Sequence, residues 1–569
     1  MTVLRRFLLL VYGPPSAVLA LYALAFLEHG WGVVSFPYQI DYGEAPELNR
    51  AVLISQGLPV YVDWSRPPYQ MANYTPLYPA VASIGVMFRG ADFFFGRLVS
   101  FLSTLAAAGL IGGIAWALGA GWRGAAIGGL LYLAAHPVWN WGAFQRVDAM
   151  AVALELAGMA LFTYGWVRQR LAWGVWVSVL VFVLAAYTRQ TVVAGAVACY
   201  GYLLWRSPRL AFGAIGAYAG LGLGVFGVFQ IVTGGQFWRH IGDGNLNRWS
   251  WNIFFHYWGP FWRLQHWAFG LVGVGIVASM VGRRAQIPLL YLAASAATAL
   301  TMGKVGSNVN YLLQLCAALA LGVGIATGEV SRVAGRLPRL LSPVPHVLLS
   351  VWVLMGLQQL YHVPHGPGDA SRRQSSVTGV MEGVRFIDWP LWRLDPLGTP
   401  PAALGERFRA IYLGEQSAAD LEHARRAHTH VAGMAGEVLS EDMTFTVTAG
   451  RRIYLQPFEF SQLAEQGDWD QMQLLEDVRQ RRFGVVVLRF RLGDEPTWHG
   501  ERINAPLRQA LEAGYRLEAN YGDYFVYRPH EPGLWNHIAN ILLPTYRRVG
   551  IGVVVSASGV QYLAENFTD

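Results

Sequence analysis

The chain has almost no lysine, few charges and few cysteines, and each shortage excludes a class of protein. Lys304 is the only lysine among the 43 Lys and Arg residues of the 569-residue chain. Charged residues make up 14% and hydrophobic residues 54%, which is too apolar for a soluble multidomain protein of this length. The two cysteines, Cys199 and Cys316, both lie within apolar runs, so they indicate buried small apolar residues rather than a disulfide or a metal site. The net charge of +7 is not gathered into a basic cluster, which argues against a nucleic-acid partner.

The apolar residues occur in long runs, as in a polytopic α-helical membrane protein. Arg5 and Arg6 precede the first run, which lacks a small-residue cleavage site and is therefore predicted to be an uncleaved membrane helix. Some runs are shorter than the roughly 20 residues of a full crossing, so the turn at Thr188-Arg189-Gln190 could also belong to a re-entrant hairpin. The eleven runs are 7–27, 98–119, 124–136, 148–166, 172–187, 191–205, 211–232, 267–282, 287–302, 309–328 and 345–361.

Arginines in alternate loops predict the orientation of these spans. The positive-inside rule places arginine-bearing loops in the cytoplasm, and an odd number of spans then puts the C-terminal region outside. The N-terminus is thus expected in the cytoplasm of a cell inner or plasma membrane. The outer face would carry loops 28–96 and 233–266 and the region 362–569, and residues 1–361 would form the membrane domain. The arginines are Arg5, Arg6, Arg123, Arg168, Arg170, Arg206, Arg209, Arg283, Arg284, Arg332, Arg336 and Arg339.

The region after residue 361 has soluble composition and predicts an α/β domain. Segments 451–458, 483–490 and 521–529 alternate like strands, and 468–482 reads as a helix. The apolar run 549–560 is too short for a confident span. The tryptophan-rich stretch 237–267 predicts an interfacial helix on the membrane surface rather than a carbohydrate platform.

The first outer loop holds two acids at the membrane boundary. A short helix is expected from near Pro46 to just before Gly57, and Asp41 and Glu44 directly precede it. One interpretation is a helix-capping acid together with a solvated one. The other is a general base that takes a proton from an acceptor hydroxyl, because an acid at this depth is costly to desolvate.

An aromatic, proline-rich stretch follows at 67–79, and it should be ordered without being helical. Tyr69, Asn73, Tyr74 and Tyr78 could together form a stacking and hydrogen-bonding surface for a sugar. An aromatic belt at the membrane interface would need the same residues and no ligand.

Several charges are predicted on the same face as Asp41. Arg146 and Asp148 precede one span, Arg189 ends another, and Lys304 ends a third. Fixed cations there could stabilise the negative charge of a phosphate leaving group, an arginine by bidentate contact and a lysine as a compact charge. The alternative is that each cation reaches for the interface or pairs with a nearby acid, as Arg146 could with Asp148.

Polar residues accompany these cations and could contact a substrate. Gln190 follows Arg189, and the segment after Lys304 offers Ser307 or Asn308 as a helix cap. The predicted substrate contacts are Tyr69, Asn73, Tyr74, Asp148, Gln190, Asn308, Asn310 and Tyr311.

An acid just after the first span, a short helix, "GLPVYVD" at 57–63 and "YTPLYP" at 74–79 resemble the GT-C glycosyltransferases. Within them the resemblance is to enzymes that use polyprenyl-phosphate sugars, such as the protein O-mannosyltransferases and the lipid A aminoarabinose transferases. It covers roughly residues 1–361 and implies a catalytic acid at Asp41, a lipid-linked donor, and transfer on the non-cytoplasmic face.

We therefore expect an integral-membrane glycosyltransferase, hexosyl or pentosyl, with an inverting displacement. Asp41 and Glu44 are its predicted catalytic acids, and its partners would be membrane lipids, the donor, and a glycan, lipid or protein acceptor. No cofactor is expected to be required, because Asp-X-X-Glu replaces Asp-X-Asp in the first loop; Asp41, Glu44 and Asp148 could still assemble a divalent metal site. The alternatives are a transporter or lipid flippase, which predicts internal repeats and ionisable residues near helix centres, and a non-catalytic assembly or receptor protein.

Overall fold

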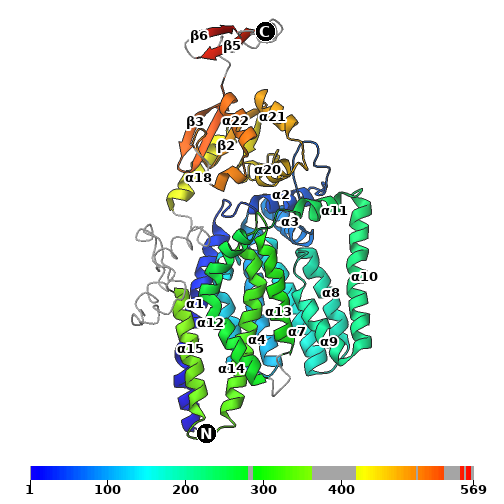
Figure 1. The fold of residues 1–569 in the computed structure, drawn as a ribbon, viewed down its shortest axis with the longest axis vertical. Coiled ribbons are helices and arrows are strands. Elements are labelled where there is room, and N and C mark those ends of the chain that lie inside the picture. Colours follow the sequence, from blue (N-terminus) through cyan, green and yellow to red (C-terminus); the bar gives the residue numbers. More distant parts are fainter. Residues whose placement is uncertain are drawn as a thin grey trace, which may run out of the picture.

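The apolar runs form a bundle of helices in a computed structural model, which describes residues 2–279, 286–361, 418–494, 498–530, 551–556 and 559–564 (Figure 1). Each predicted run overlaps one helix, so the prediction of a polytopic helical protein is confirmed. These helices are α1 (Thr2–Ser35), α4 (Phe94–Ala117), α5 (Gly121–Ala134), α7 (Val147–Phe162, continued by a π-helix Thr163–Arg168), α8 (Trp173–Thr188), α9 (Ala194–Arg206), α10 (Pro208–Val232), α12 (Trp251–Ser279), α13 (Gln286–Ala299), α14 (Leu313–Ala334) and α15 (Pro343–Tyr361).

Length and composition allow six stretches of described helix to cross a membrane. Others, such as Trp173–Thr188 and Pro343–Leu357, are apolar but shorter, and a full crossing needs about 20 residues. The chain is thus an integral-membrane protein. The six stretches are Phe7–Ser35, Phe94–Ala117, Val147–Arg168, Pro208–Val232, Gln286–Gly303 and Val309–Ala334.

Helix α14 is the packing centre of the bundle, and every residue from Leu313 to Glu329 is buried. Its contact with α5 depends on glycine. A Cβ atom at Gly124 would lie 2.4 Å from the carbonyl oxygen of Gly324, and one at Gly324 would lie 2.7 Å from the carbonyl of Gly124. Small residues let two membrane helices approach closely and gain van der Waals contact.

Short elements cover the end of the bundle opposite the N-terminus, beneath the C-terminal region (Figure 1). The predicted helix of the first loop is confirmed as α2, which ends before Gly57, a residue with φ of +69°. The elements are α2 (Glu44–Ser55), α3 (Leu77–Arg89), α6 (His136–Trp141), α11 (Gln236–Ile241) and the 3-10 helices η2 (Asp243–Asn245), η3 (Leu300–Gly303) and η4 (Val309–Leu312).

The C-terminal region is an α/β unit around a four-stranded sheet of order β1-β2-β4-β3, parallel between β1 and β2 and antiparallel elsewhere. Both faces are covered, because Val485 and Val487 pack in a cluster with α18 while Val486 and Leu488 pack in a second cluster with α20–α22. The elements are α18 (Ala418–Ala432), β1 (Glu437–Ser440), α19 (Thr444–Val447), α20 (Pro457–Gln466), α21 (Met472–Arg479), β2 (Phe483–Leu488), η7 (Trp498–Glu501), α22 (Ala505–Gly514), β3 (Tyr515–Tyr521), β4 (Tyr524–Pro529), and a separate hairpin, β5 (Ile551–Ser556) with β6 (Gly559–Ala564). The predicted domain boundary at 361/362 adjoins residues 362–417, which lie outside the described residues.

Two predictions of local structure were wrong. Segment 451–458 is not a strand of the sheet, because its backbone is hydrogen-bonded to the first loop instead. The Tyr69 N–H donates to the Tyr454 carbonyl (2.7 Å), and the Gln456 N–H donates to the Tyr69 carbonyl (3.0 Å). The tryptophan-rich stretch is not a separate interfacial helix, because α12 runs without a break from Trp251 to Ser279.

Candidate functional site

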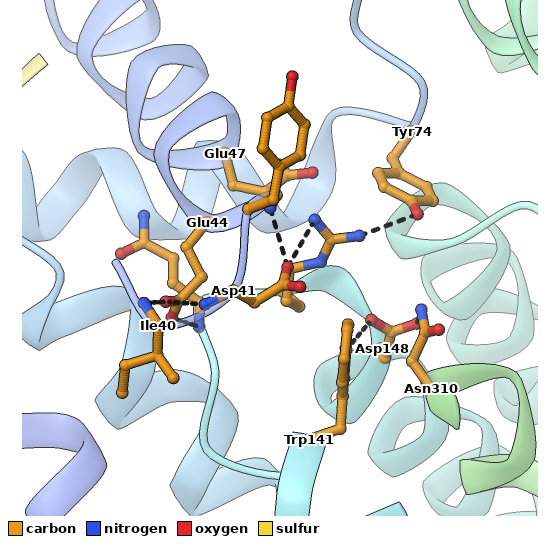
Figure 2. A network of polar contacts seen from close by, with 12 residues as sticks. Ile40, Asp41, Glu44, Glu47, Tyr74, Trp141, Asp148 and Asn310 are labelled. Carbon is orange, nitrogen blue, oxygen red and sulfur yellow. Dashed lines mark hydrogen bonds and ion pairs between the residues drawn. The ribbon is translucent and has the colours of Figure 1, made fainter. Parts of the chain in front are cut away.

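Asp41 lies in the turn between α1 and α2 (Figure 2), and its ion-pair partner is Arg146. Its Oδ2 accepts a hydrogen bond from the Gly43 N–H (2.9 Å) and lies 3.3 Å from an Arg146 terminal nitrogen. Position 43 must be glycine for this pair to form, because a Cβ there would sit 1.1 Å from that nitrogen. The turn therefore presents a half-buried carboxylate next to a guanidinium.

The environment raises the pKa of Asp41 above its usual range. Burial is the dominant cause, and the Arg146 charge opposes it. A carboxylate with a raised pKa binds a proton more readily, which brings it closer to the pKa that suits proton transfer near neutral pH.

Glu44 lies in the opposite situation, fully buried against Arg97. Burial alone would raise the pKa of Glu44, but Arg97 and hydrogen bonds from backbone N–H groups hold it below its ordinary value. One of these donors is the N–H of Ile40, at 2.7 Å from Oε2, and another is the N–H of Asp41 itself, at 3.2 Å. Glu44 thus remains charged and fixes the backbone that carries Asp41.

A third carboxylate, Asp148 at the start of α7, is surrounded by donors. It forms an ion pair with Arg189. It also accepts from the Asn310 side chain at 3.0 Å and from the Trp141 indole at 3.0 Å (Figure 2). The Arg189 guanidinium also lies over the Tyr311 ring, 4.4 Å from its centroid. Asp148, Arg189, Asn310 and Tyr311 come from three separate segments, and the structure brings them together.

Three buried amide oxygens nearby have no hydrogen-bond donor among the described residues: Asn73 Oδ1, Gln190 Oε1 and Asn310 Oδ1. The segments that carry the first two are tied together, because the Gln190 side chain donates to the Asn73 carbonyl at 2.8 Å. Buried polar atoms are nearly always satisfied by protein or water. These oxygens are therefore free to accept hydrogen bonds from a ligand or from water.

The predicted aromatic surface divides into two parts. Tyr74 faces the site, where its hydroxyl accepts from Arg146 at 3.3 Å. Tyr69 does not, because it is 1% exposed and packs against Trp469 in the core of the C-terminal region. Tyr78 is also fully buried and donates to the Gly96 carbonyl. The assignment of Tyr69 and Tyr78 to a sugar-binding surface is corrected accordingly: both rings serve packing.

Lys304 lies in the loop between η3 and η4, half-buried. The loop is anchored to the segment before α12: the Ser250 N–H donates to the Gly303 carbonyl (2.7 Å) and the Val305 N–H to the Arg248 carbonyl (2.9 Å). Within the described ranges no carboxylate lies within ion-pair distance of the Lys304 ammonium. The predicted cap is confirmed at Asn308, whose side chain accepts from the Val309 N–H at 2.7 Å.

The C-terminal region also reaches this site, which the sequence did not predict. The Tyr42 hydroxyl donates to Glu459 at 3.2 Å and accepts from the Phe458 N–H at 2.9 Å. The Phe458 ring in turn fits against Gly306, where a Cβ would lie 2.5 Å from it. Burial raises the pKa of Glu459. The first turn of α20 therefore joins the Asp41 turn to the Lys304 loop, a contact across more than 400 positions of the chain that no local pattern reveals.

Two of the three acids that could have held a divalent metal already have partners at their oxygens. The oxygens of Glu44 are occupied by Arg97 and backbone N–H groups, and those of Asp148 by Arg189, Asn310 and Trp141. In the part of the chain that the structure describes, no three His, Cys, Asp or Glu residues converge as ligands.

Similarity to known proteins is found for this chain among solved structures. No family model and no curated protein sequence matches it. Its structure resembles ArnT from Cupriavidus metallidurans in two crystal structures, one bound to undecaprenyl phosphate (TM-score 0.53) and one in the apo state (TM-score 0.54). Both share 14% identity and cover 89% of this chain and 97% of ArnT. An identity this low shows the fold alone, and the fold of this chain is the GT-C fold that its first loop predicts.

Proposed function

We propose that the chain is an integral-membrane glycosyltransferase that moves a hexosyl or pentosyl residue from a polyprenyl-phosphate donor to an acceptor hydroxyl. The observation that carries the proposal is the pair of acids in the first loop. The pKa of Asp41 is raised and that of Glu44 is lowered, and environments that push two pKa values apart assign different roles to the two groups. The donor class is supported by ArnT, which shares the fold and has been crystallised with undecaprenyl phosphate.

Asp41 is the proposed general base. Its carboxylate accepts the proton of the acceptor hydroxyl, and the hydroxyl oxygen then attacks the anomeric carbon of the donor sugar. The bond from that carbon to the phosphate oxygen breaks, and its electron pair stays on the phosphate. A single displacement of this kind inverts the anomeric centre. Glu44 is a positioning residue in this scheme, because Arg97 and the backbone occupy its oxygens.

The leaving phosphate gains negative charge, and fixed cations stabilise it. Arg146 and Arg189 each share their charge with an aspartate, so they are proposed as hydrogen-bond donors that orient the phosphate. Lys304 has no such partner among the described residues and is proposed as the main counter-charge. The amide oxygens of Asn73, Gln190 and Asn310 are proposed to accept from sugar hydroxyls, alongside Asn308, Tyr74 and Tyr311.

The proposed location is the outer face of the membrane, with the N-terminus in the cytoplasm. The acceptor is a glycan, a lipid or a protein. No metal participates in the proposed steps.

The test is an assay of the purified full chain in detergent with a panel of undecaprenyl-phosphate hexoses and pentoses. Release of undecaprenyl phosphate that requires an added acceptor is the expected result for at least one donor. Transport of these lipids across vesicle membranes with no release from any of them would identify a flippase and overturn the proposal.

A further inference from the structure

A pocket lies outside the candidate site, where the first loop meets the C-terminal region. Its volume is about 310 Å³, which is at the small end of the range for small-molecule sites. Its lining includes the rings of Pro67, Pro68 and Tyr454 and the arginines Arg451, Arg452 and Arg482.

The lining is positively charged. Glu437 is its only acid and pairs with Arg482 at 2.8 Å. Arg451 donates to backbone carbonyls, including that of Gly436 at 3.3 Å, so no carboxylate offsets its charge. Arg452 is exposed and has no ion-pair or hydrogen-bond partner among the described residues. Arg482 also lies 3.5 Å from Asp477, so the positive charge that no described carboxylate offsets is that of Arg451 and Arg452.

Flat apolar faces beside guanidinium donors match the two parts of an acidic sugar. The apolar face of a pyranose ring packs on aromatic and proline rings, and a carboxylate or phosphate accepts paired hydrogen bonds from arginine. The Arg482 guanidinium lies over the buried Tyr454 ring, 5.1 Å from its centroid, so the flat surface open to a sugar is that of Pro67 and Pro68, of which Pro67 is exposed.

The pocket adjoins the segment that builds the candidate site. Tyr69 follows Pro68 and pairs with Leu455, next to Tyr454, and the same loop continues to Tyr74 beside Arg146. One loop thus contributes both to this pocket and to the candidate site, although its residues Tyr69, Met71 and Ala72 are buried.

We propose that this pocket binds an anionic sugar residue, one that carries a carboxylate or a phosphate, with Arg452 as the principal contact. An acceptor that carries such a residue would be held here, a role that rests on the proposed function, whereas the binding itself does not.

The test measures binding to the full chain in detergent, without a donor, by isothermal titration calorimetry. The probes are tetragalacturonate, maltotetraose as a neutral tetrasaccharide, and glucose 6-phosphate. We expect at least one anionic probe to bind and maltotetraose to bind at least tenfold more weakly. A preference for tetragalacturonate identifies a carboxylate ligand, and a preference for glucose 6-phosphate identifies a phosphate ligand.

Arg452→Ala should weaken the anionic probe about tenfold or more, the loss typical of one charge-assisted hydrogen bond. Arg516→Ala is the matched control, because Arg516 is also exposed and lies on β3, at the opposite edge of the sheet from β1. Equal binding of charged and neutral probes, no binding at all, or equal losses in the two variants would overturn the pocket assignment. Specific binding by a chain that shows no transferase activity would leave the pocket standing and remove only its role in holding the acceptor.

Discussion

Arg97 forms a bidentate ion pair with Glu44, with its Nε 2.7 Å from Oε1 and a terminal nitrogen 2.7 Å from Oε2. Both side chains are fully buried. The same guanidinium donates to the Tyr38 carbonyl at 2.6 Å, so it fastens the end of α1 to the start of α2. Asp41, only three residues before Glu44, is left with a single ion pair, at 3.3 Å from Arg146, and with partial exposure. This asymmetry gives the two acids different tasks.

Asp41→Asn should lower the rate of sugar transfer by about 10²–10⁴-fold, the usual contribution of a general base. The amide keeps the shape of the side chain and its hydrogen bond from Gly43, so undecaprenyl phosphate should still bind. Transfer rates and binding are measured on the same preparation. Asp92→Asn is the control, because Asp92 belongs to the same loop but forms a more exposed pair with Arg89. Full activity in Asp41→Asn would exclude this residue as the base.

The pH dependence of kcat/KM should report the raised pKa of Asp41. Activity requires the deprotonated carboxylate, so it falls as the pH drops through the pKa of Asp41, and this acid limb should lie above the ordinary value of 3.8. Arg146 opposes the rise, so Arg146→Gln should shift the limb to still higher pH as well as slow the reaction. A limb that stays in place in Arg146→Gln would contradict the pairing.

Lys304→Ala should weaken binding of undecaprenyl phosphate about tenfold or more, since it removes a charge-assisted contact. Lys304→Arg keeps the charge but replaces a compact ammonium with a planar fork, so it should restore part of the affinity and less of the turnover. Binding is measured by native mass spectrometry or tryptophan fluorescence, with Arg516→Ala as the control for net charge. Wild-type affinity in Lys304→Ala would remove the phosphate role.

The sequence predicted the elements of the bundle because long apolar runs have few other stable structures in a membrane. It also predicted α2, β2 and β4, since each has a local pattern. It missed β1 and β3, which are short or mostly exposed. It assigned a strand to 451–458, where the partner is Tyr69, because local alternation does not say which backbone will pair with it.

The candidate site shows the same limit. The sequence shows which acids and cations lie at the membrane boundary, but not which of them pair. In the structure Asp41 pairs with Arg146 and Asp148 pairs with Arg189. Which acid is free to react was not predictable, because Arg97 lies 53 positions from Glu44 and had no distinguishing feature in the sequence. Tyr69 looked like a sugar contact for the same reason: its burial depends on Trp469, 400 residues away.

Arg97→Met should lower the stability of the folded chain by about 3–5 kcal/mol, because it leaves Glu44 buried without its counter-charge. Arg89→Met removes a partly exposed pair and should cost about 0–1 kcal/mol. Thermal unfolding in detergent separates the two. Folding lowers the pKa of Glu44, so the stabilisation is complete above the ordinary value of 4.5 and is lost as the pH falls through the lower folded value. Equal unfolding temperatures for the two variants would contradict a stabilising role of the Arg97–Glu44 ion pair.

Glu155 should position the site from within the bundle. It lies two helical turns after Asp148 on α7, where its oxygens accept from the Gly195 N–H (2.6 Å), from the Gln314 amide (2.7 and 2.8 Å) and from the Tyr291 hydroxyl (3.0 Å). Gln314 is one turn after Asn310, the partner of Asp148. The two carboxylates of α7 therefore hold the start of α14 in register with Arg189, and they also tie in α9 and α13.

Glu155→Gln keeps the shape of the side chain but sets an amide against the Gln314 amide, so at least one interhelical hydrogen bond is lost at a cost of about 0.6–1.7 kcal/mol. We expect a lower unfolding temperature together with weaker binding of undecaprenyl phosphate, because Asn310 and Arg189 lose their alignment. Glu329→Gln is the control: Glu329 is also buried, but its partner Arg332 is on the same helix, far along α14 from the site. It should lower the unfolding temperature without changing lipid affinity. If Glu155→Gln behaves in the same way, Glu155 contributes to stability alone and the coupling between the two carboxylates of α7 is absent.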